Sequence, residues 1–397
     1  MSSVSESYKI FLDQFVNEHL SKPPDEKIPP FRLVETQIRP FEVSGHCCEW
    51  ATQYLYTHRC PVYLLNQICV ETVKRVTLTE PYSHIPSPDL DETKVLNDSE
   101  TWLEARALCD LTFKTVEDII TEWLSEPPTN WVESSEHGGH VVSHYAIKNT
   151  RRKMEDRHTM IPLMRMFTTA EAYQDASLYA VYDGHGGPEA SYYCAAQFLN
   201  NLIGQTLSPT DKAKSLEAAF SKTDADFGAK AAKEAILVSE GRVVEIMKPH
   251  KPESEEEKQR IEALGGSVVW HGTWRVNGTL AVSRAIGDVD HKPYISSKAD
   301  SKTHPLDQDD EYVIVACDGL WDTVTPQEAT QLVYEHVQSG KPFQSVAEVL
   351  VRAAKNEGST DNITVIVVFL KQTLSPPTTS EDNESNDEYE DALEEIV

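Results

Sequence analysis

The sequence predicts an α/β sandwich, in which helices cover β-sheets, preceded by a helical N-terminal extension. From about residue 141, short runs rich in Val, Ile and Tyr alternate with helical patterns, which is typical of sheets covered by helices. Before this point, apolar residues recur at helical spacing and no strand alternation is present. We therefore divide the chain into a helical accessory region, 1–140, a sandwich domain, 141–371, and a tail, 372–397.

The accessory region contains three predicted helices. The first ends at the proline-rich stretch 22–30, and the second begins at Pro61, a residue suited to the first helical position, and extends to about Leu78. The third ends before Pro127, and the polar segment 80–98 is expected to be a loop. The apolar stripes of the first and third helices consist of Tyr8, Phe11, Phe15, Val116, Ile119, Ile120 and Trp123.

The sandwich domain contains six predicted strands and two well-marked helices. Helix 326–338 has Thr325 as its N-cap and Glu328 three residues later, which is the capping-box pattern. Helix 253–264 is acidic in its first turn and ends at two glycines, in agreement with the helix dipole and a left-handed cap. The predicted strands are 141–147, 178–182, 243–247, 279–283, 312–316 and 363–369.

The chain is strongly acidic, and this limits its partners. It has 36 basic and 64 acidic residues, for a net charge of −28. Such a protein repels nucleic-acid phosphates and anionic membrane surfaces, so neither is an expected partner. The tail has nine acidic residues among the last 17 and is expected to be disordered, because this composition cannot bury a core.

The cysteines and the N-terminus point to the cytoplasm, or to the nucleus. The first residues have neither a basic segment nor a following apolar segment, so no signal peptide is expected. No run approaches 18 apolar residues, so no membrane-spanning helix is expected. The seven cysteines have no regular spacing, which favours reduced thiols over a disulfide framework.

Acidic residues lie beside the ends of several predicted strands. Asp183 follows strand 178–182 and opens a glycine turn, Asp318 follows 312–316, and Asp361 precedes 363–369. The pair Glu155-Asp156 follows the first strand. Each Asp-Gly step alone is also a common turn. Together, however, such carboxylates repel one another unless cations neutralise them, and oxygen ligands without a Cys/His cluster favour Mg²⁺ or Mn²⁺.

Five motifs in order resemble the type 2C metal-dependent serine/threonine protein phosphatases. They cover about 141–371, and their joint occurrence is far more specific than any single motif. The sequence around the first motif and the helical N-terminal extension are similar to those of one branch of this family, called calmodulin-dependent-kinase phosphatases or partners of PIX. The motifs are RRKMEDRH (151–158), VYDGHGG (181–187), RVNGTLAVSRAIGD (275–288), ACDGLWD (316–322) and STDNITV (359–365).

The resemblance implies a centre with two Mn²⁺ or Mg²⁺ ions. Asp183 would bridge both ions, with Asp318 and Asp361 completing the ligands of the first. The second would be served by the Gly184 carbonyl and by Glu155 through water. Such an enzyme hydrolyses phosphoserine and phosphothreonine by attack of an activated water, without a phosphoenzyme. Its partners would be phosphorylated proteins, with protein kinases suggested by the narrower branch.

The resemblance also implies roles for residues that do not bind metal. Arg151 would hold the substrate phosphate as a bidentate fork, and His185 would protonate the leaving oxygen. Alternatively, Arg151 is a surface residue in a basic run and His185 caps the turn. Asp288 is interpreted as a structural hydrogen-bonding residue rather than a ligand. Asp322 either joins a third, looser metal or pairs with a nearby cation.

The family pattern is broken once, near residues 234 and 235. Between Asp224 and Gly241 the family carries two further strands, including a Gly-Asp-Ser segment whose aspartate can hold a third metal. Here Glu234 runs directly into AILV, so roughly 25 residues are missing, enough for about two ordinary strands. We therefore expect low stability and weak or no activity. The alternative function is a catalytically impaired form that acts as a binding or scaffold protein through its helical region.

Overall fold

The structure is a computed structural model, and it describes the residues in the ranges 4–22, 33–78, 103–128, 140–204, 212–227, 234–239, 242–245, 250–371 and 373–377. The chain divides into two compact units, each built from segments that are distant in sequence. The first comprises Met1–Gly139, Glu155–Ala232 and His250–Ser301, and the second His140–Met154, Lys233–Pro249 and Lys302–Val397. The predicted domains, in contrast, are each one continuous stretch of the sequence, and their boundaries stay a prediction.

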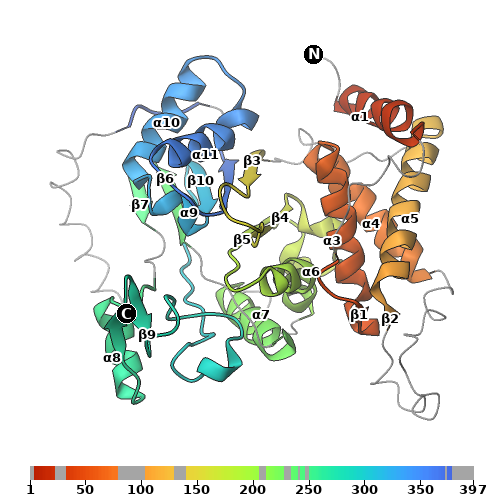
Figure 1. Ribbon diagram of the computed structural model, residues 1–397. Coiled ribbons are helices and arrows are strands. Elements are labelled where there is room, and N and C mark those ends of the chain that lie inside the picture. The colour runs from red at the N-terminus through yellow and green to blue at the C-terminus, as the bar shows by residue number, and fades with distance from the viewer. Residues whose placement is uncertain are drawn as a thin grey trace, which may run out of the picture. The chain divides into compact units, whose positions relative to one another are not determined.

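The N-terminal part of the first unit is a group of packed helices (Figure 1). Its elements are α1 (Val4–Gln14), the π-helical turn η1 (Phe15–Leu20), α3 (Val43–Thr57), α4 (Val62–Leu78) and α5 (Ala105–Ser125), with the short antiparallel strands β1 (Gln37–Ile38) and β2 (Leu103–Glu104). The three predicted helices are confirmed, and all seven stripe residues are buried in one apolar cluster. The predicted loop 80–98 lies outside the described residues.

Helix α3 was not predicted, because polar side chains interrupt its buried face. His46 and Glu49 are buried beside Cys47 and Trp50, so the apolar pattern of this segment is incomplete. The His46 ring lies between Glu35 and the Tyr192 hydroxyl, at 3.3 Å from each. Burial lowers the pKa of His46 to about 3, so this ring is neutral at physiological pH.

The remainder of the first unit contains a two-stranded antiparallel sheet with helices beside it. β4 (Arg157–Ile161) pairs with β5 (Leu178–Tyr182), and α6 (Glu189–Ile203) packs against both strands. Isolated two-stranded pairs are marginal in water, so this packing is needed for stability. The other elements are η5 (Met164–Met166), η6 (Glu171–Tyr173), α7 (Lys212–Phe227), α8 (Glu255–Ala263), β8 (Val268–Trp270), β9 (Trp274–Val276) and η7 (Val289–His291).

In this region one prediction from the sequence is confirmed and another is wrong. The helix predicted at 253–264 is confirmed as α8, and its glycine cap is formed, since Gly265 has a φ of +87°. The strand predicted at 279–283 is wrong. After β9, Asn277 and Gly278 take φ of +50° and +72° and reverse the chain, so that Leu280 makes only an isolated bridge to Val276. The segment 279–283 thus follows a tight turn and forms no strand.

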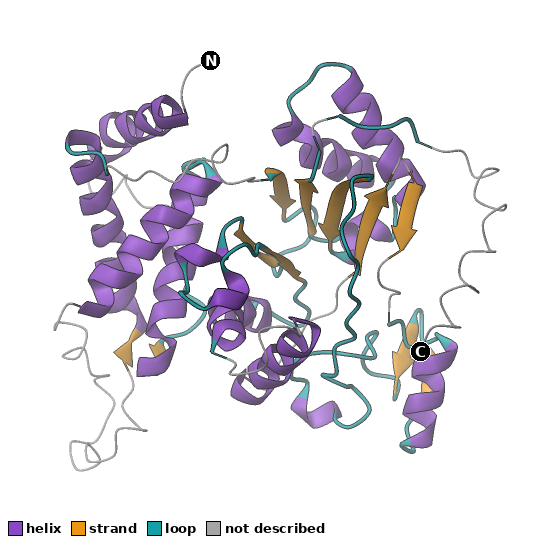
Figure 2. Ribbon diagram, turned by 180° about the vertical axis from the view of Figure 1, so that it is seen from behind, coloured by secondary structure: helices purple, strands orange, loops and turns teal. Residues whose placement is uncertain are grey.

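The second unit is a five-stranded antiparallel sheet with helices on one face (Figure 2). The strand order is β3-β11-β10-β6-β7, and all seven residues of the β11 strand are buried. Its strands are β3 (Val141–Ile147), β6 (Glu234–Ser239), β7 (Arg242–Glu245), β10 (Asp310–Ala316) and β11 (Ile363–Phe369), and its helices are α9 (Asp318–Trp321), α10 (Pro326–Gln338), η8 (Phe343–Ser345) and α11 (Val346–Asn356).

The predicted features of this unit are confirmed where the structure describes them. Strands 141–147, 312–316 and 363–369 are present, and 243–247 corresponds to β7. The capping box of α10 is formed: the Glu328 amide donates to Thr325 Oγ1 at 3.2 Å, and the Thr325 amide donates to Glu328 Oε2 at 2.8 Å. Of the predicted tail, the structure describes 373–377 only.

The predicted excision site lies at the first residue of β6. This strand pairs with β10 on one side and β7 on the other, so the five-stranded sheet is continuous across the junction. Among the described residues, β4 and β5 form a sheet of only two strands, so any missing strands would belong to this sheet.

The helices of the described residues were also compared with the length and hydropathy that a membrane span requires, and none of them meets both. All seven cysteines are free thiols.

Candidate metal centre

Asp183 is placed by a strand, a glycine turn and a helix start. It follows directly after β5, and the turn continues through Gly186 and Gly187, whose φ values of +72° and +145° favour glycine. Pro188 then caps the start of α6. The buried strand fixes the backbone on one side and the helix fixes it on the other. The half-buried Asp183 side chain is thus held at the end of the sheet.

Gly184 lies against the backbone of Glu155, where no larger residue fits. A Cβ at this position would be 2.5 Å from the Glu155 carbonyl oxygen and 2.9 Å from Ser191 Oγ. The Ser191 hydroxyl donates a hydrogen bond to the same Glu155 carbonyl. The first turn of α6 therefore holds the Glu155–Asp156 segment against the Asp183–Gly184 turn.

This contact brings two carboxylates together. The side chains of Asp156 and Asp183 each offer an oxygen within 4.8 Å of the other, and Asp156 is only 3% exposed. Paired carboxylates repel each other unless a cation or a shared proton neutralises them, and hard oxygen donors match Mg²⁺ and Mn²⁺. The donor set therefore fits a divalent metal ion. We call Asp156, Asp183 and Gly184 the first half-site.

Asp156 was not singled out from the sequence, where Glu155 was preferred as the ligand. The structure places Glu155 at the same turn, half-buried, with its carbonyl held by Ser191. The signal for Asp156 was present in the sequence as the second acid of a pair. Its selection depends on side-chain direction, since Asp156 immediately precedes β4 and points into the buried side.

His185 contacts Asp288, as expected for a structural aspartate. His185 Nε2 lies 3.2 Å from Asp288 Oδ2. Asp288 has a φ of +46° and follows Gly287, whose amide donates to Asp224 Oδ1 at 2.6 Å. Lys292 Nζ also binds Asp224, at 2.7 and 2.9 Å from its two oxygens. The Asp288 turn is thus fixed by a charged contact, and it orients the His185 ring.

Asp318 and Asp361 lie at one end of the sheet in the second unit. β10 and β11 are antiparallel, and Ala316 at the end of β10 faces Val365 near the start of β11. Asp318 therefore follows β10 at the same edge where Asp361 precedes β11. Both acids are at least partly accessible to solvent. We call Asp318, Asp361 and Arg151 the second half-site.

The backbone around these acids is tightly fitted. A Cβ on Gly319 would lie 1.9 Å from the Asn362 carbonyl oxygen, so only glycine fits after Asp318. Ser359 Oγ donates to the Gly319 carbonyl at 2.8 Å. Asn362 Nδ2 donates to the carbonyls of Lys148 and Lys153, at 2.9 and 3.0 Å, and so fastens the loop that carries Arg151. Asn362 is a positioning residue that the sequence analysis missed.

Arg151 forms an ion pair with Asp361, and both side chains are substantially exposed. The role of Arg151, phosphate binding or a surface position in a basic run, stays a prediction. Asp322 is exposed at the C-terminal cap of α9, where its amide donates to the Asp318 carbonyl at 2.9 Å. The structure thus groups Glu155, Asp183, Gly184 and His185 in the first unit, and Arg151, Asp318, Asp322 and Asp361 in the second.

The change Gly184→Ala is expected to disturb the first half-site without changing its ligands. The new methyl group must push away a backbone carbonyl, and overpacking of this kind costs about 1–3 kcal/mol. We expect a lower thermal midpoint and weaker Mn²⁺ binding, measured by thermal unfolding with and without Mn²⁺. An unchanged midpoint together with unchanged Mn²⁺ stabilisation would contradict the close packing described above.

Comparisons with known proteins show to which family the chain belongs. A family model described as Protein phosphatase 2C matches residues 141–234 and 232–363. The chain belongs to the protein phosphatase 2C family. The two matched segments overlap at residues 232–234, beside the junction near 234 and 235 where strands are predicted to be missing.

Relatives in the protein phosphatase 2C family extend the similarity to the helical region. Mouse protein phosphatase 1E is 39% identical over 405 residues, covering 92% of this chain and 52% of that protein. Human protein phosphatase 1F is 36% identical over 406 residues, covering 94% of this chain and 89% of that protein. The chain thus spans about half the length of protein phosphatase 1E. These two relatives confirm the narrower branch predicted from the sequence.

A solved structure confirms the fold. The structure of a C. elegans sex determining protein superposes with a TM-score of 0.74 at 20% identity, covering 91% of this chain and 95% of that one. Coverage of this extent includes helices from the accessory region as well as the sandwich. The fold of this chain, with helices of the accessory region included, is therefore shared with that protein.

Proposed function

We propose that the chain is a metal-dependent protein phosphatase that hydrolyses phosphoserine and phosphothreonine. The observation that carries the proposal is the close pair of carboxylates, Asp156 and Asp183, at the end of β5 in a chain of the protein phosphatase 2C family. Phosphorylated proteins are the proposed substrates, with protein kinases as candidates because of the branch. The cytoplasm, with the nucleus as an alternative, is the proposed location.

The proposed cofactors are two Mn²⁺ or Mg²⁺ ions. When bound, such ions neutralise the phosphate and lower the pKa of water so that it attacks phosphorus in line with the leaving oxygen. Asp183, Asp318 and Asp361 would hold them, with Glu155 through water and the Gly184 carbonyl as further ligands. Asp156 joins this set from the structure, because its buried carboxylate lies beside Asp183. Asp322 is kept as the candidate for a third, looser ion.

The remaining residues act on substrate and proton. Arg151 would exchange its contact with Asp361 for the substrate phosphate, since a guanidinium binds two phosphate oxygens as well as it binds a carboxylate. His185, oriented by Asp288, would give a proton to the serine or threonine oxygen as the P–O bond breaks. The attacking water oxygen stays on phosphorus, so the products are a free hydroxyl side chain and inorganic phosphate.

The test is hydrolysis of a phosphothreonine peptide by the full chain. We expect phosphate release with Mn²⁺, loss of release with EDTA, and recovery when excess Mn²⁺ is added. Phosphate release that continues in EDTA would contradict a metal-dependent mechanism. Circular dichroism on the same samples shows whether the chain stays folded when the metal is removed.

A second candidate function is binding without catalysis, through the accessory helices. The observation that favours it is the β4–β5 sheet, which has only two strands within the described residues although it carries Asp183. A folded chain that releases no phosphate under any metal condition, and that still binds a partner through residues 1–140, would support this alternative over the enzyme.

A further inference from the structure

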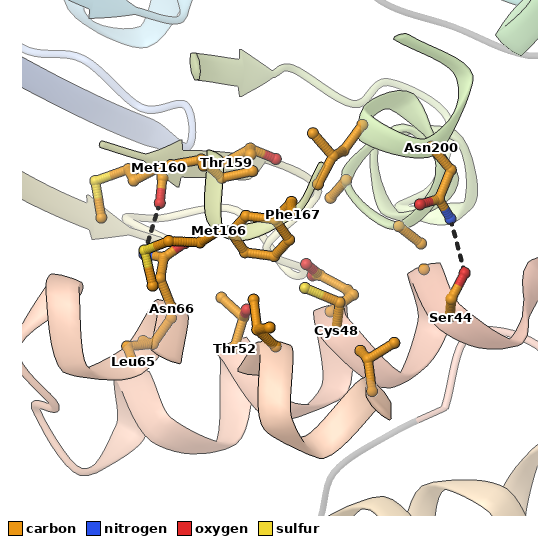
Figure 3. A pocket seen from close by; sticks show the side chains of 18 of the residues that line it. Ser44, Cys48, Thr52, Leu65, Asn66, Thr159, Met160, Met166, Phe167 and Asn200 are labelled. Atoms are coloured by element: carbon orange, nitrogen blue, oxygen red, sulfur yellow. Dashed lines mark hydrogen bonds between the residues drawn. The ribbon is translucent and has the colours of Figure 1, made fainter. Parts of the chain in front are cut away.

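A cavity of about 310 Å³ lies within the first unit, between the accessory helices and the β4–α6 layer. Helices α3 and α4 form one wall, and β4, the segment after it and α6 form the other (Figure 3). Its volume is at the lower end of the range for small-molecule sites. The cavity lies away from the Asp183 turn, so the proposed reaction does not use it.

The walls of the cavity are mainly apolar. Leu65 and Val70 contribute from α4, Met160 from β4, and Phe167 and Leu199 from the opposite side. Figure 3 shows Met166 and Phe167 above Thr52 and Cys48 of α3. An apolar compound would therefore replace water over most of this surface, and burial of apolar area favours binding by roughly 25 cal/mol per Å².

The polar lining of the cavity includes two asparagine side chains, Asn66 and Asn200, beside the Ser44, Thr52 and Thr159 hydroxyls and the His158 ring. The Asn66 amide already donates to the carbonyls of Val62 and Met160, at 2.7 and 3.2 Å. The Asn200 amide donates to Ser44 Oγ at 3.1 Å and contacts Gln197. In the described part of the chain, the hydrogen bonds of both residues use this nitrogen, which leaves their carbonyl oxygens for a ligand.

Glu49 adds an acidic group to the same cavity. It lines the cavity from α3, is 6% exposed, and receives a hydrogen bond from Gln53 on one carboxylate oxygen. Burial raises the pKa of Glu49 to about 7, while the Gln53 bond and the charge of Arg157 act in the opposite direction. A buried carboxylate is stabilised by a cationic donor and repels an anion.

We propose that this cavity binds a small lipophilic amine, whose apolar body fills the space between α4, β4 and α6 and whose ammonium group meets Glu49. The apolar walls select the body, and the buried Glu49 carboxylate selects the charged donor head. Among the described residues that line the cavity, Glu49 is the one with an acidic side chain.

The position of the cavity gives the ligand a route to the first half-site. Thr159 and Met160 of β4 lie three and four residues after Asp156, and Ala195 of α6 lies one turn after Ser191. Ser191 holds the Glu155 carbonyl against Gly184. A ligand that moves either β4 or α6 therefore shifts the carboxylates that would hold the metal, so occupancy is expected to change Mn²⁺ affinity. This effect rests on the proposed function, whereas binding of the amine does not.

The test uses three matched probes that differ only in the head group: 4-phenylbutylamine, 4-phenylbutanol and 4-phenylbutyrate. Titration calorimetry with the full chain at pH 8, above the raised pKa of Glu49, is expected to show the amine binding at least tenfold more tightly than the carboxylate. Glu49→Gln is expected to weaken amine binding about tenfold and to leave alcohol binding within twofold, because the shape is kept and only the charge is lost.

Variants that fill the cavity provide the second arm. Val70→Phe and Thr52→Leu reduce the space and should each abolish amine binding, whereas Gln67→Leu on α4 does not face the cavity and should not. Two filling variants on different helices are used so that one misfolded variant does not decide the result. Equal binding of all three probes, or amine binding that survives both filled cavities, would overturn the proposal.

The effect of the amine on metal binding is measured by titrating the chain with Mn²⁺, with and without saturating amine, and comparing the two Mn²⁺ affinities. A threefold or larger change in Mn²⁺ affinity is expected, and an unchanged affinity would overturn the regulatory part. If the chain binds the amine but hydrolyses no phosphopeptide, the proposed function fails while the cavity assignment stands. The two proposals are therefore separable.

Discussion

Replacing Asp183 by asparagine is expected to lower Mn²⁺-dependent hydrolysis of a phosphothreonine peptide by roughly a thousandfold. The substitution keeps the shape of the side chain and removes the negative charge that would bridge two metal ions. Loss of several kcal/mol of transition-state stabilisation corresponds to about this factor. The measurement is the initial rate of phosphate release at saturating Mn²⁺, with Mn²⁺ affinity determined on the same samples.

The matched control is Asp175→Asn, which makes the same chemical change at an exposed residue shortly before β5. It should leave the rate and the Mn²⁺ affinity unchanged. The asparagine at 183 removes the repulsion between the two carboxylates, so the metal-free variant is expected to unfold at the same temperature as the parent chain or higher. A variant at 183 that retains the parental rate would remove Asp183 from the mechanism.

Inserting the two strands that are predicted to be missing is expected to have the second large effect. A two-stranded segment of about 25 residues, of the kind that the family carries at this position, would be inserted between Glu234 and Ala235. New strands beside β5 would supply partners for its backbone groups and a firmer base for Asp183. We expect a rise of about 10 °C in the thermal midpoint and a turnover increase on the order of 100-fold, since small displacements of catalytic groups cost rates of this size.

A Gly/Ser insert of equal length at the same junction controls for chain length. It adds loop entropy without strands and should give neither gain. The prediction is contradicted if the parent chain already unfolds in one cooperative transition and turns over as fast as the chain with the restored segment. In that case the two-stranded β4–β5 sheet would be sufficient for the fold and for the reaction.

The sequence predicted most elements that combine a clear apolar period with marked ends. The strands that contain Tyr182, Ala316 and Val365 consist mainly of apolar residues, and α10 carries its own capping box, so local chemistry was sufficient. Helix α3 was missed because His46 and Glu49 occupy buried positions. Strand β4, which reads RHTMI, was missed because its first three residues are polar or half-buried.

The candidate site was predicted in composition but not in its internal contacts. Asp183, Asp318 and Asp361 were found because each lies at the end of a buried strand, a position visible in the sequence. The contact of Arg151 with Asp361 joins residues 210 positions apart, and the choice of Asp156 depends on side-chain direction. Such long-range pairings follow from the three-dimensional fold and leave no local pattern.

The interleaved segments of the two units have a consequence for synthesis of the protein. β3 pairs with β11 along its whole length, from Val141–Phe369 to Ile147–Ile363, so more than 200 residues separate the partners. At about 5–20 residues per second, a ribosome needs roughly 10–40 s to make this interval. Throughout that time β11 has not yet been synthesised, so β3 lacks this partner strand. Contacts between residues so far apart in sequence also slow folding. The nascent chain is therefore exposed to chaperones and to aggregation for much of its translation.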